Sequence, residues 1–114
     1  MAFVFAWDDW NKEHVTKHGS NAGDARYVVD HAQAPFPREM GGGKYLVWGQ
    51  TASGDYLEVI FAFRIPERLA FADLDILDWG TMIDYPATVS IYICHAMPMK
   101  DKQLRQYRRI RSQS

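Results

Sequence analysis

The chain has a single cysteine, Cys94, among its 114 residues. One thiol excludes an intrachain disulfide and a multi-cysteine zinc site. Cys94 lies in an apolar, strand-like run, which predicts a buried structural thiol rather than a nucleophile. The sequence also lacks an apolar run of membrane-spanning length and a charged start followed by an apolar core. We therefore expect a cytoplasmic protein without a membrane segment.

A strong net charge is also absent, since the formal net charge is −1. The charges are nevertheless unevenly placed. Residues 100–114 hold six basic groups and one acidic group, a net +5, and residues 65–87 hold one basic and five acidic groups, a net −4. A basic end on a near-neutral domain is typical of a nucleic-acid surface, a docking surface for an acidic partner, or a solvated terminal helix.

The composition is that of a folded domain, with 47% hydrophobic and 14% aromatic residues. We expect one domain over residues 1–114 with an α+β fold: a small antiparallel sheet and helices in the order β-α-α-β-β-β-α. Helices are predicted near 9–18, 22–32 and 100–111, and loops at 34–38 and 41–43, where prolines and glycines gather. Strands are predicted at 3–7, 44–50, 56–63 and 90–96, with a hairpin turn at 52–55.

The first helix has the clearest signals. Asp8 can cap its start, and Gly19 can end it with a positive φ. Trp10, His14 and His18 recur every four residues and so share one face, which suits either a phosphate-bearing ligand or a buried amphipathic stripe. Two histidines at this spacing can also reach one metal ion, but no third ligand is near in sequence. We expect no metal and no cofactor.

Several segments, in a shared order, resemble the BrnT-type toxins of bacterial toxin–antitoxin systems, which are small ribonucleases with a RelE-like fold. The matching residues are Phe5, Trp7, Asp8, Asn11, His14, Lys17, His18, Gly19, Ala25, Val28, Val29, 44–51, Gly54, Tyr56, Leu57, 59–61, 95–99, Leu104, Arg105 and 107–109. Two features depart from the family pattern. Met97 stands where an arginine usually precedes the Pro-Met pair, and residues 65–87 are an insertion.

The resemblance implies cleavage of RNA by attack of the 2′-OH, which needs a base, an acid and cations for the phosphate. His18 and His95 are the candidate acid and base, because histidine titrates near neutrality. Lys17 and Arg64 are further candidates for the catalytic site, as phosphate ligands. The candidate RNA-binding residues are Lys44, Tyr45, Trp48, Arg105, Arg108 and Arg109.

Each of these assignments has a structural alternative. Trp48 can pack in the core, His95 can be satisfied by backbone at a strand end, and Arg64 can pair with an acid of the insert. Three functions therefore stay open. They are a BrnT-like endoribonuclease that binds RNA and a cognate antitoxin, a non-catalytic RNA- or protein-binding module of that fold, and a homodimer associating through residues 65–87.

Overall fold

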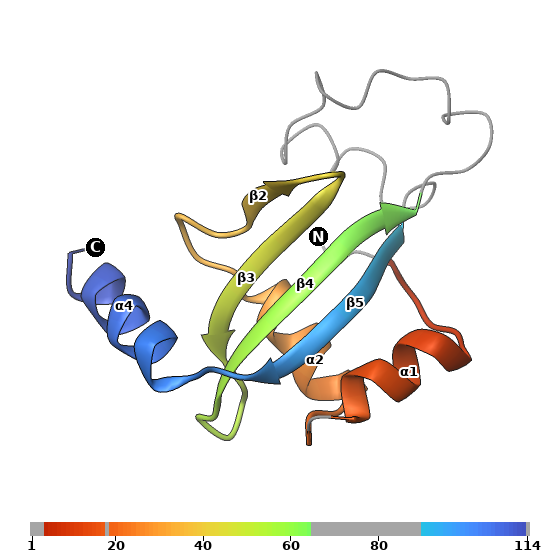
Figure 1. Ribbon diagram of the computed structural model, residues 1–114, viewed down its shortest axis with the longest axis horizontal. Coiled ribbons are helices and arrows are strands. Elements are labelled where there is room, and N and C mark those ends of the chain that lie inside the picture. Colours follow the sequence, from red (N-terminus) through yellow and green to blue (C-terminus); the bar gives the residue numbers. More distant parts are fainter. Residues whose placement is uncertain (1–3, 18, 65–89, 114) are drawn as a thin grey trace.

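The computed structural model describes residues 4–17, 19–64 and 90–113, and it has an α+β fold. The elements, in chain order, are β1 (Val4–Ala6), α1 (Asp9–Thr16), α2 (Ala22–Asp30), β2 (Arg38–Gly41), β3 (Lys44–Gln50), β4 (Tyr56–Arg64), β5 (Ser90–Pro98) and α4 (Asp101–Ser112). Figure 1 shows the strands side by side, with α2 passing behind them and α4 standing beyond the β2–β3 edge. The predicted insert at 65–87 lies outside the described residues.

The strands form one sheet in the order β1-β5-β4-β3-β2. The hairpin predicted from residues 44–63 is confirmed, because β3 pairs antiparallel with β4 from Lys44–Ala62 to Gln50–Tyr56. The predicted antiparallel sheet is confirmed for β2 to β5, and at one edge β1 runs parallel to β5. The sheet is therefore mixed, though mostly antiparallel.

The loops predicted at 34–38 and 41–43 also need correction, because β2 begins in the first and ends in the second, and it pairs with the first residues of β3. Gly41, Gly42 and Gly43 all have positive φ, a conformation that side chains disfavour, and they make the tight connection from β2 to β3. The pairing ends at Leu46. The later half of β3 has no partner on that side among the described strands.

The predicted cap of α1 at Asp8 is confirmed. Asp8 accepts a hydrogen bond from the backbone N–H of Asn11, and the Asn11 side chain accepts one from the N–H of Asp8, which is a capping box. Asn21 caps α2 through the N–H of Asp24. Gly19 has the predicted positive φ, +85°, but α1 ends before it, at Thr16, with Lys17 as the C-cap.

The core lies between the sheet and the pair α1–α2. One face of the sheet, which we call the helix face, presents fully buried residues of β3, β4 and β5 to these helices, among them Val47, Val59, Phe61, Ile93 and Ala96. Val15 of α1 and Val28 and Val29 of α2 pack against them. No helix in the described part of the chain is long and apolar enough to cross a membrane.

Candidate functional site

The other side of the sheet, which we call the front face, carries the polar residues that the sequence pointed to. Side chains alternate between the two faces of a strand, so the register places Lys44, Trp48, Glu58 and His95 on one side. The helix α4 contacts this face at Glu58, through Gln103, and at Tyr56, through Tyr107. The front face is therefore the candidate site.

Glu58 is the centre of this site. Its side chain is only 14% exposed, and its Oε1 accepts hydrogen bonds from Trp48 Nε1 at 3.2 Å and from Gln103 Nε2 at 2.9 Å. Its Oε2 lies 3.5 Å from Nε2 of His95. One carboxylate thus joins β3, β5 and α4 and holds the imidazole of His95, which is 31% exposed.

Glu58 was not among the predicted site residues, although the sequence held a signal for it. It is the only charged residue between Tyr56 and Phe63, a run that is otherwise apolar. A carboxylate in such a strand must find partners or lose hydration without compensation. The partner Gln103 is 45 residues away, so sequence spacing gave no sign of it.

A second cluster lies at the other end of the front face, around the N-cap of α1. The hydroxyl of Tyr92 donates to both carboxylate oxygens of Asp8, at 2.9 and 3.0 Å. Arg64 lies 3.6 Å from the same carboxylate and 4.4 Å above the ring of Tyr92. Arg64 therefore pairs with Asp8 of the N-terminal helix, a partner that the sequence reading did not consider.

The electrostatics of this cluster follow from these contacts. The hydrogen bond from the Asn11 N–H, with those from Tyr92 and the charge of Arg64, lowers the pKa of Asp8 against an opposing desolvation. Desolvation and the nearby Asp8 carboxylate raise the pKa of Tyr92. Burial likewise raises the pKa of Cys94, a thiol that was predicted to be buried and is partly buried. A raised pKa disfavours the thiolate, in keeping with a structural thiol.

The two aromatic residues among the predicted RNA-binding residues, Tyr45 and Trp48, lie on opposite faces. Trp48 is 8% exposed and packs against Phe36, so little of its ring is open to a base. Tyr45 lies on the helix face, where it stacks on Phe61 with ring centroids 5.5 Å apart. They are three residues apart in one strand, and an odd spacing puts two side chains on different sides.

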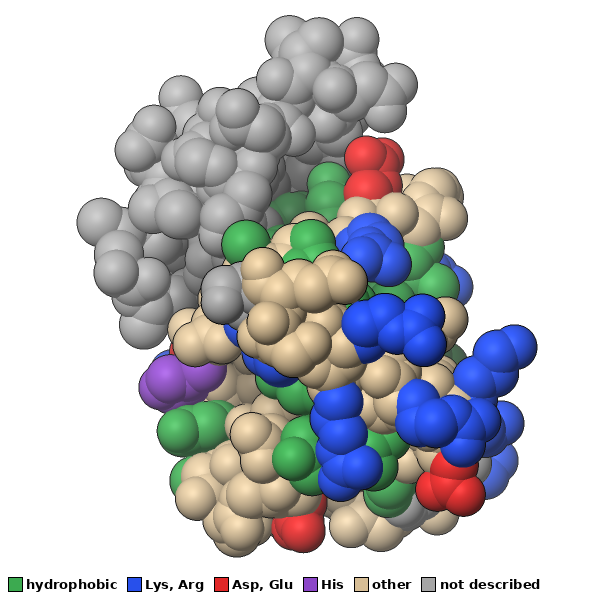
Figure 2. Space-filling view, turned by 90° about the vertical axis from the view of Figure 1, so that its left-hand side faces the viewer, with side chains coloured by type: hydrophobic (Ala, Val, Ile, Leu, Met, Phe, Trp, Pro, Cys, Tyr) green, Lys and Arg blue, Asp and Glu red, His purple; other side chains and the backbone are tan. Residues whose placement is uncertain are grey.

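The predicted basic residues of α4 form a separate surface. Arg105, Arg108 and Arg109 are exposed, and Figure 2 shows Lys and Arg side chains gathered on the end of the molecule that carries α4. Tyr107 is the buried residue of this helix. Arg108 lies 5.7 Å above the ring of Tyr56, whereas helical spacing puts Arg105 and Arg109 on the side away from Tyr107.

Of the two remaining predicted catalytic residues, Lys17 lies in the described part of the chain. Lys17 is exposed at the end of α1, the helix that packs with its Val15 against the opposite side of the sheet. His18 lies outside the described residues, so its pairing with His95 stays a prediction. The described residues hold no group of three or more His, Cys, Asp or Glu side chains that could bind a metal ion.

Comparisons with known proteins found no matching family model, no matching curated protein and no matching solved structure. The structure itself shows a small α+β domain with a mixed five-stranded sheet. The resemblance to BrnT-type toxins rests on the motifs in the sequence.

Proposed function

We propose that the protein is a metal-independent endoribonuclease of the BrnT toxin type, which binds RNA across the front face of its sheet. The observation that carries this proposal is the His95–Glu58 pair, with 3.5 Å between Nε2 and Oε2, on the same face as Lys44 and Arg64. The motif containing His95 also belongs to the sequence resemblance.

RNA cleavage requires a group that accepts the proton of the 2′-OH and a group that donates a proton to the leaving 5′-oxygen. His95 suits either role, because an imidazole exchanges protons near neutral pH. Glu58 does not touch the RNA in this scheme. Its carboxylate fixes the orientation of the ring and stabilises the imidazolium once it forms. Trp48 and Gln103 hold Glu58 in place from two other elements.

Cations on the same face supply contacts to the phosphates. Lys44 pairs in register with Ala62, and Arg64 follows two residues later on β4. His95 pairs with Ile60, four residues before Arg64, so Arg64 lies roughly 13 Å along the strand from the level of His95. This distance is too long for one phosphate. Arg64 therefore serves an adjacent nucleotide, and Lys44 lies between the two levels.

The proposal is tested in two incubations of the purified chain, both in the presence of a metal chelator. One uses a 5′-labelled RNA, and the other uses the same sequence with 2′-deoxy sugars. We expect cleavage of the RNA alone, with 2′,3′-cyclic phosphate ends. His95→Gln should lower the rate by about 100- to 10,000-fold, the usual contribution of a general acid or base. His31→Gln is the matched control, because His31 lies on α2 and bonds the backbone oxygen of Tyr27.

Substitutions of Met97 can distinguish this function from that of a non-catalytic RNA-binding module. Its register partner is Glu58, so a side chain at this position lies beside the His95–Glu58 pair. Met97→Arg should increase cleavage by supplying a cation there, whereas Met97→Leu should not. If the folded wild-type protein and the folded Met97→Arg variant both bind RNA and neither cleaves it, the result would favour the non-catalytic RNA-binding module.

The toxin assignment adds a protein partner, a cognate antitoxin, and a cellular effect. Induction of the chain in a bacterial host should stop growth and protein synthesis, and His95→Gln should relieve the arrest. Normal growth on induction of a cleaving protein would separate the ribonuclease from the toxin role.

A further inference from the structure

Aromatic rings gather at the end of the front face where α1 lies beside β5 (Figure 1). The Trp10 ring stacks on the imidazole of His14, with centroids 3.7 Å apart and planes 21° apart. The Tyr92 ring of β5 lies 6.3 Å from the Trp10 ring, at an interplanar angle of 22°. Arg64 of β4 lies 4.4 Å from the centre of the Tyr92 ring. We call these four side chains the ring platform.

The Trp10 side chain leaves much of the ring platform open to solvent. Trp10 is 50% exposed, and among the described residues Met40 is the only other exposed large hydrophobic residue. The buried residues of α1 are Asn11 and Val15, and Trp10 lies about a third of a turn round the helix from them. The indole therefore lies along the border between core and solvent, where a flat ligand can cover its ring.

Positive charge lies on both sides of the ring platform. Arg64 has a side-chain exposure of 54%, although it pairs with Asp8 at 3.6 Å. Lys17 is exposed and follows the indole by two turns, so helical spacing puts it on the same side of α1. The other acids of α1, Asp9 and Glu13, lie toward the side opposite its buried residues. The rings thus suit a ligand that combines flat rings with negative charge.

The ring platform adjoins the His95–Glu58 pair. Tyr92 pairs with Ala62 and His95 pairs with Ile60, so the two side chains are spaced by two residues of β4, roughly 7 Å. Both side chains are on the front face. An RNA strand with a phosphate at His95 therefore brings the base of a neighbouring nucleotide to the platform.

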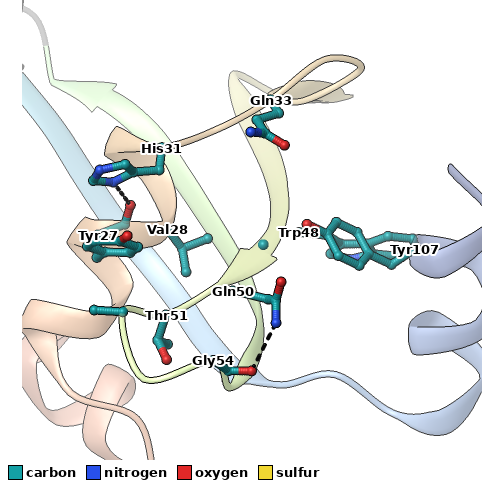
Figure 3. Close-up of a pocket in the computed structure, with 11 residues that line it drawn as sticks. Tyr27, Val28, His31, Gln33, Trp48, Gln50, Thr51, Gly54 and Tyr107 are labelled. Carbon is teal, nitrogen blue, oxygen red and sulfur yellow. Dashed lines mark hydrogen bonds between the residues drawn. The ribbon is translucent and has the colours of Figure 1, made fainter. Parts of the chain in front are cut away.

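The pocket in Figure 3 contains a similar pair of rings in different surroundings. Its volume is about 330 Å³, and Tyr27 and His31 of α2 line it with ring centroids 3.9 Å apart. In both pairs the histidine bonds the backbone oxygen four residues earlier, at 2.8 Å. No Lys or Arg side chain lines this pocket in the described part of the chain, and β4 lies between its strand, β3, and β5. The pocket thus lacks the cations that the ring platform has.

We propose that the ring platform binds an unpaired base of single-stranded RNA by stacking, beside the phosphate at His95. Every base has a π-face, so stacking tolerates many sequences, and nearby cations hold the backbone. The bases of a duplex are already stacked on one another, so the platform selects single strands. The inference rests on the proposed function for its ligand, RNA, but it concerns binding and not cleavage.

The test is fluorescence anisotropy with a labelled oligoribonucleotide that carries 2′-O-methyl sugars. This probe lacks the attacking 2′-OH, so binding is measured separately from cleavage. Trp10→Ala should weaken binding by about 5- to 150-fold, the usual range for the loss of one stacked base, and Trp10→Phe should keep most of the affinity. A 2-aminopurine placed at successive positions should lose fluorescence at one or two of them with wild type and not with Trp10→Ala.

Two variants are matched controls for Trp10→Ala. Met40→Ala removes an equally exposed apolar side chain, and Tyr27→Ala removes the ring of the other ring–imidazole pair. Both should change the affinity by less than about twofold. The probe annealed to its complement should bind more weakly than the single strand, with the same affinity for wild type and Trp10→Ala.

Several results would overturn the proposal. They are an affinity for the single strand that Trp10→Ala leaves unchanged, no binding by the folded wild type, or a loss with Tyr27→Ala alone, which would place the base in the pocket of Figure 3. An equal loss for duplex and single strand with Trp10→Ala would overturn it too. Binding that depends on Trp10, without cleavage of unmodified RNA, would support the ring platform and contradict the endoribonuclease.

Discussion

At the scale of single residues, the motif that opens the chain is mainly structural. Asp8 caps α1, accepts the hydroxyl of Tyr92 and faces Arg64. Asn11, fully buried, completes the capping box and donates to the carbonyl of Ala6, which ties β1 to α1. The spacing of Asp8 and Asn11 is therefore explained by how the chain turns from strand to helix, without any role in catalysis.

The lowered pKa of Asp8 gives a prediction about acid stability. Its folded pKa lies below the usual 3.8, so its carboxylate contributes stability that is fully present above that value and is lost as the pH falls through the folded pKa. Asp8→Asn keeps a good N-cap residue but removes the charge, so its unfolding free energy should depend less on pH below about pH 4. Urea unfolding at neutral pH and at pH 3 measures this, with Asp9→Asn as the control. Equal acid sensitivity in wild type and Asp8→Asn would contradict the assignment.

At the scale of elements, local signals predicted most of the structure. The caps of α1 and α2 and the β3–β4 hairpin depend on residues within a few positions of each other, so the sequence shows them directly. The strand β2 was missed because the prolines before it and the glycines at its end are typical of loops. In the structure these glycines make the turn from β2 into β3. The parallel pairing of β1 with β5 joins residues far apart in sequence, for which periodicity holds no information.

Part of the candidate site was likewise predictable from the sequence, and part was not. His95, Lys44 and Arg64 were predicted and lie on one face, whereas the burial of Trp48 depends on the packing of Phe36 against it. The placement of Tyr45 on the other face follows from its odd spacing from Trp48, which the sequence already shows. The roles of Glu58 and Gln103 depend on a contact between β4 and α4 that only the fold brings about.

The start of α1 supplies the prediction at this scale. Asn11→Ala removes a fully buried amide that makes one bond in the capping box and one to Ala6. The backbone groups left behind lose their partners, so the free energy of unfolding should fall by about 2–3 kcal/mol. Chemical denaturation checks this against Lys12→Ala, an exposed change on the same helix, expected to stay within about 0.5 kcal/mol. RNA cleavage by the folded fraction of Asn11→Ala should be unchanged. Intact stability with lost cleavage would instead assign Asn11 to the site.

At the scale of the whole molecule, positive charge lies on two surfaces while the chain as a whole is near neutral. One is the front face with Lys44 and Arg64, and the other is α4 with Arg105, Arg108 and Arg109. The sequence suggested a single RNA-binding set, but the fold separates its members: the sheet presents the first pair, and α4 carries the rest beyond the β2–β3 edge (Figures 1 and 2). The two surfaces can therefore bind different partners.

Salt dependence tells these two surfaces apart. Each phosphate contact adds to the slope of log affinity against log salt, so removing one Lys or Arg contact to single-stranded RNA should reduce that slope by about 0.7. Lys44→Gln should show this reduction, and Arg105→Gln on the outer side of α4 is the matched loss of one positive charge, expected to leave the slope nearly unchanged. The two changes are far enough apart to act independently, so the double variant should show the sum of the single effects. Fluorescence anisotropy of a labelled RNA over a series of salt concentrations measures all four proteins. A slope that falls with Arg105→Gln and not with Lys44→Gln would move the RNA to α4.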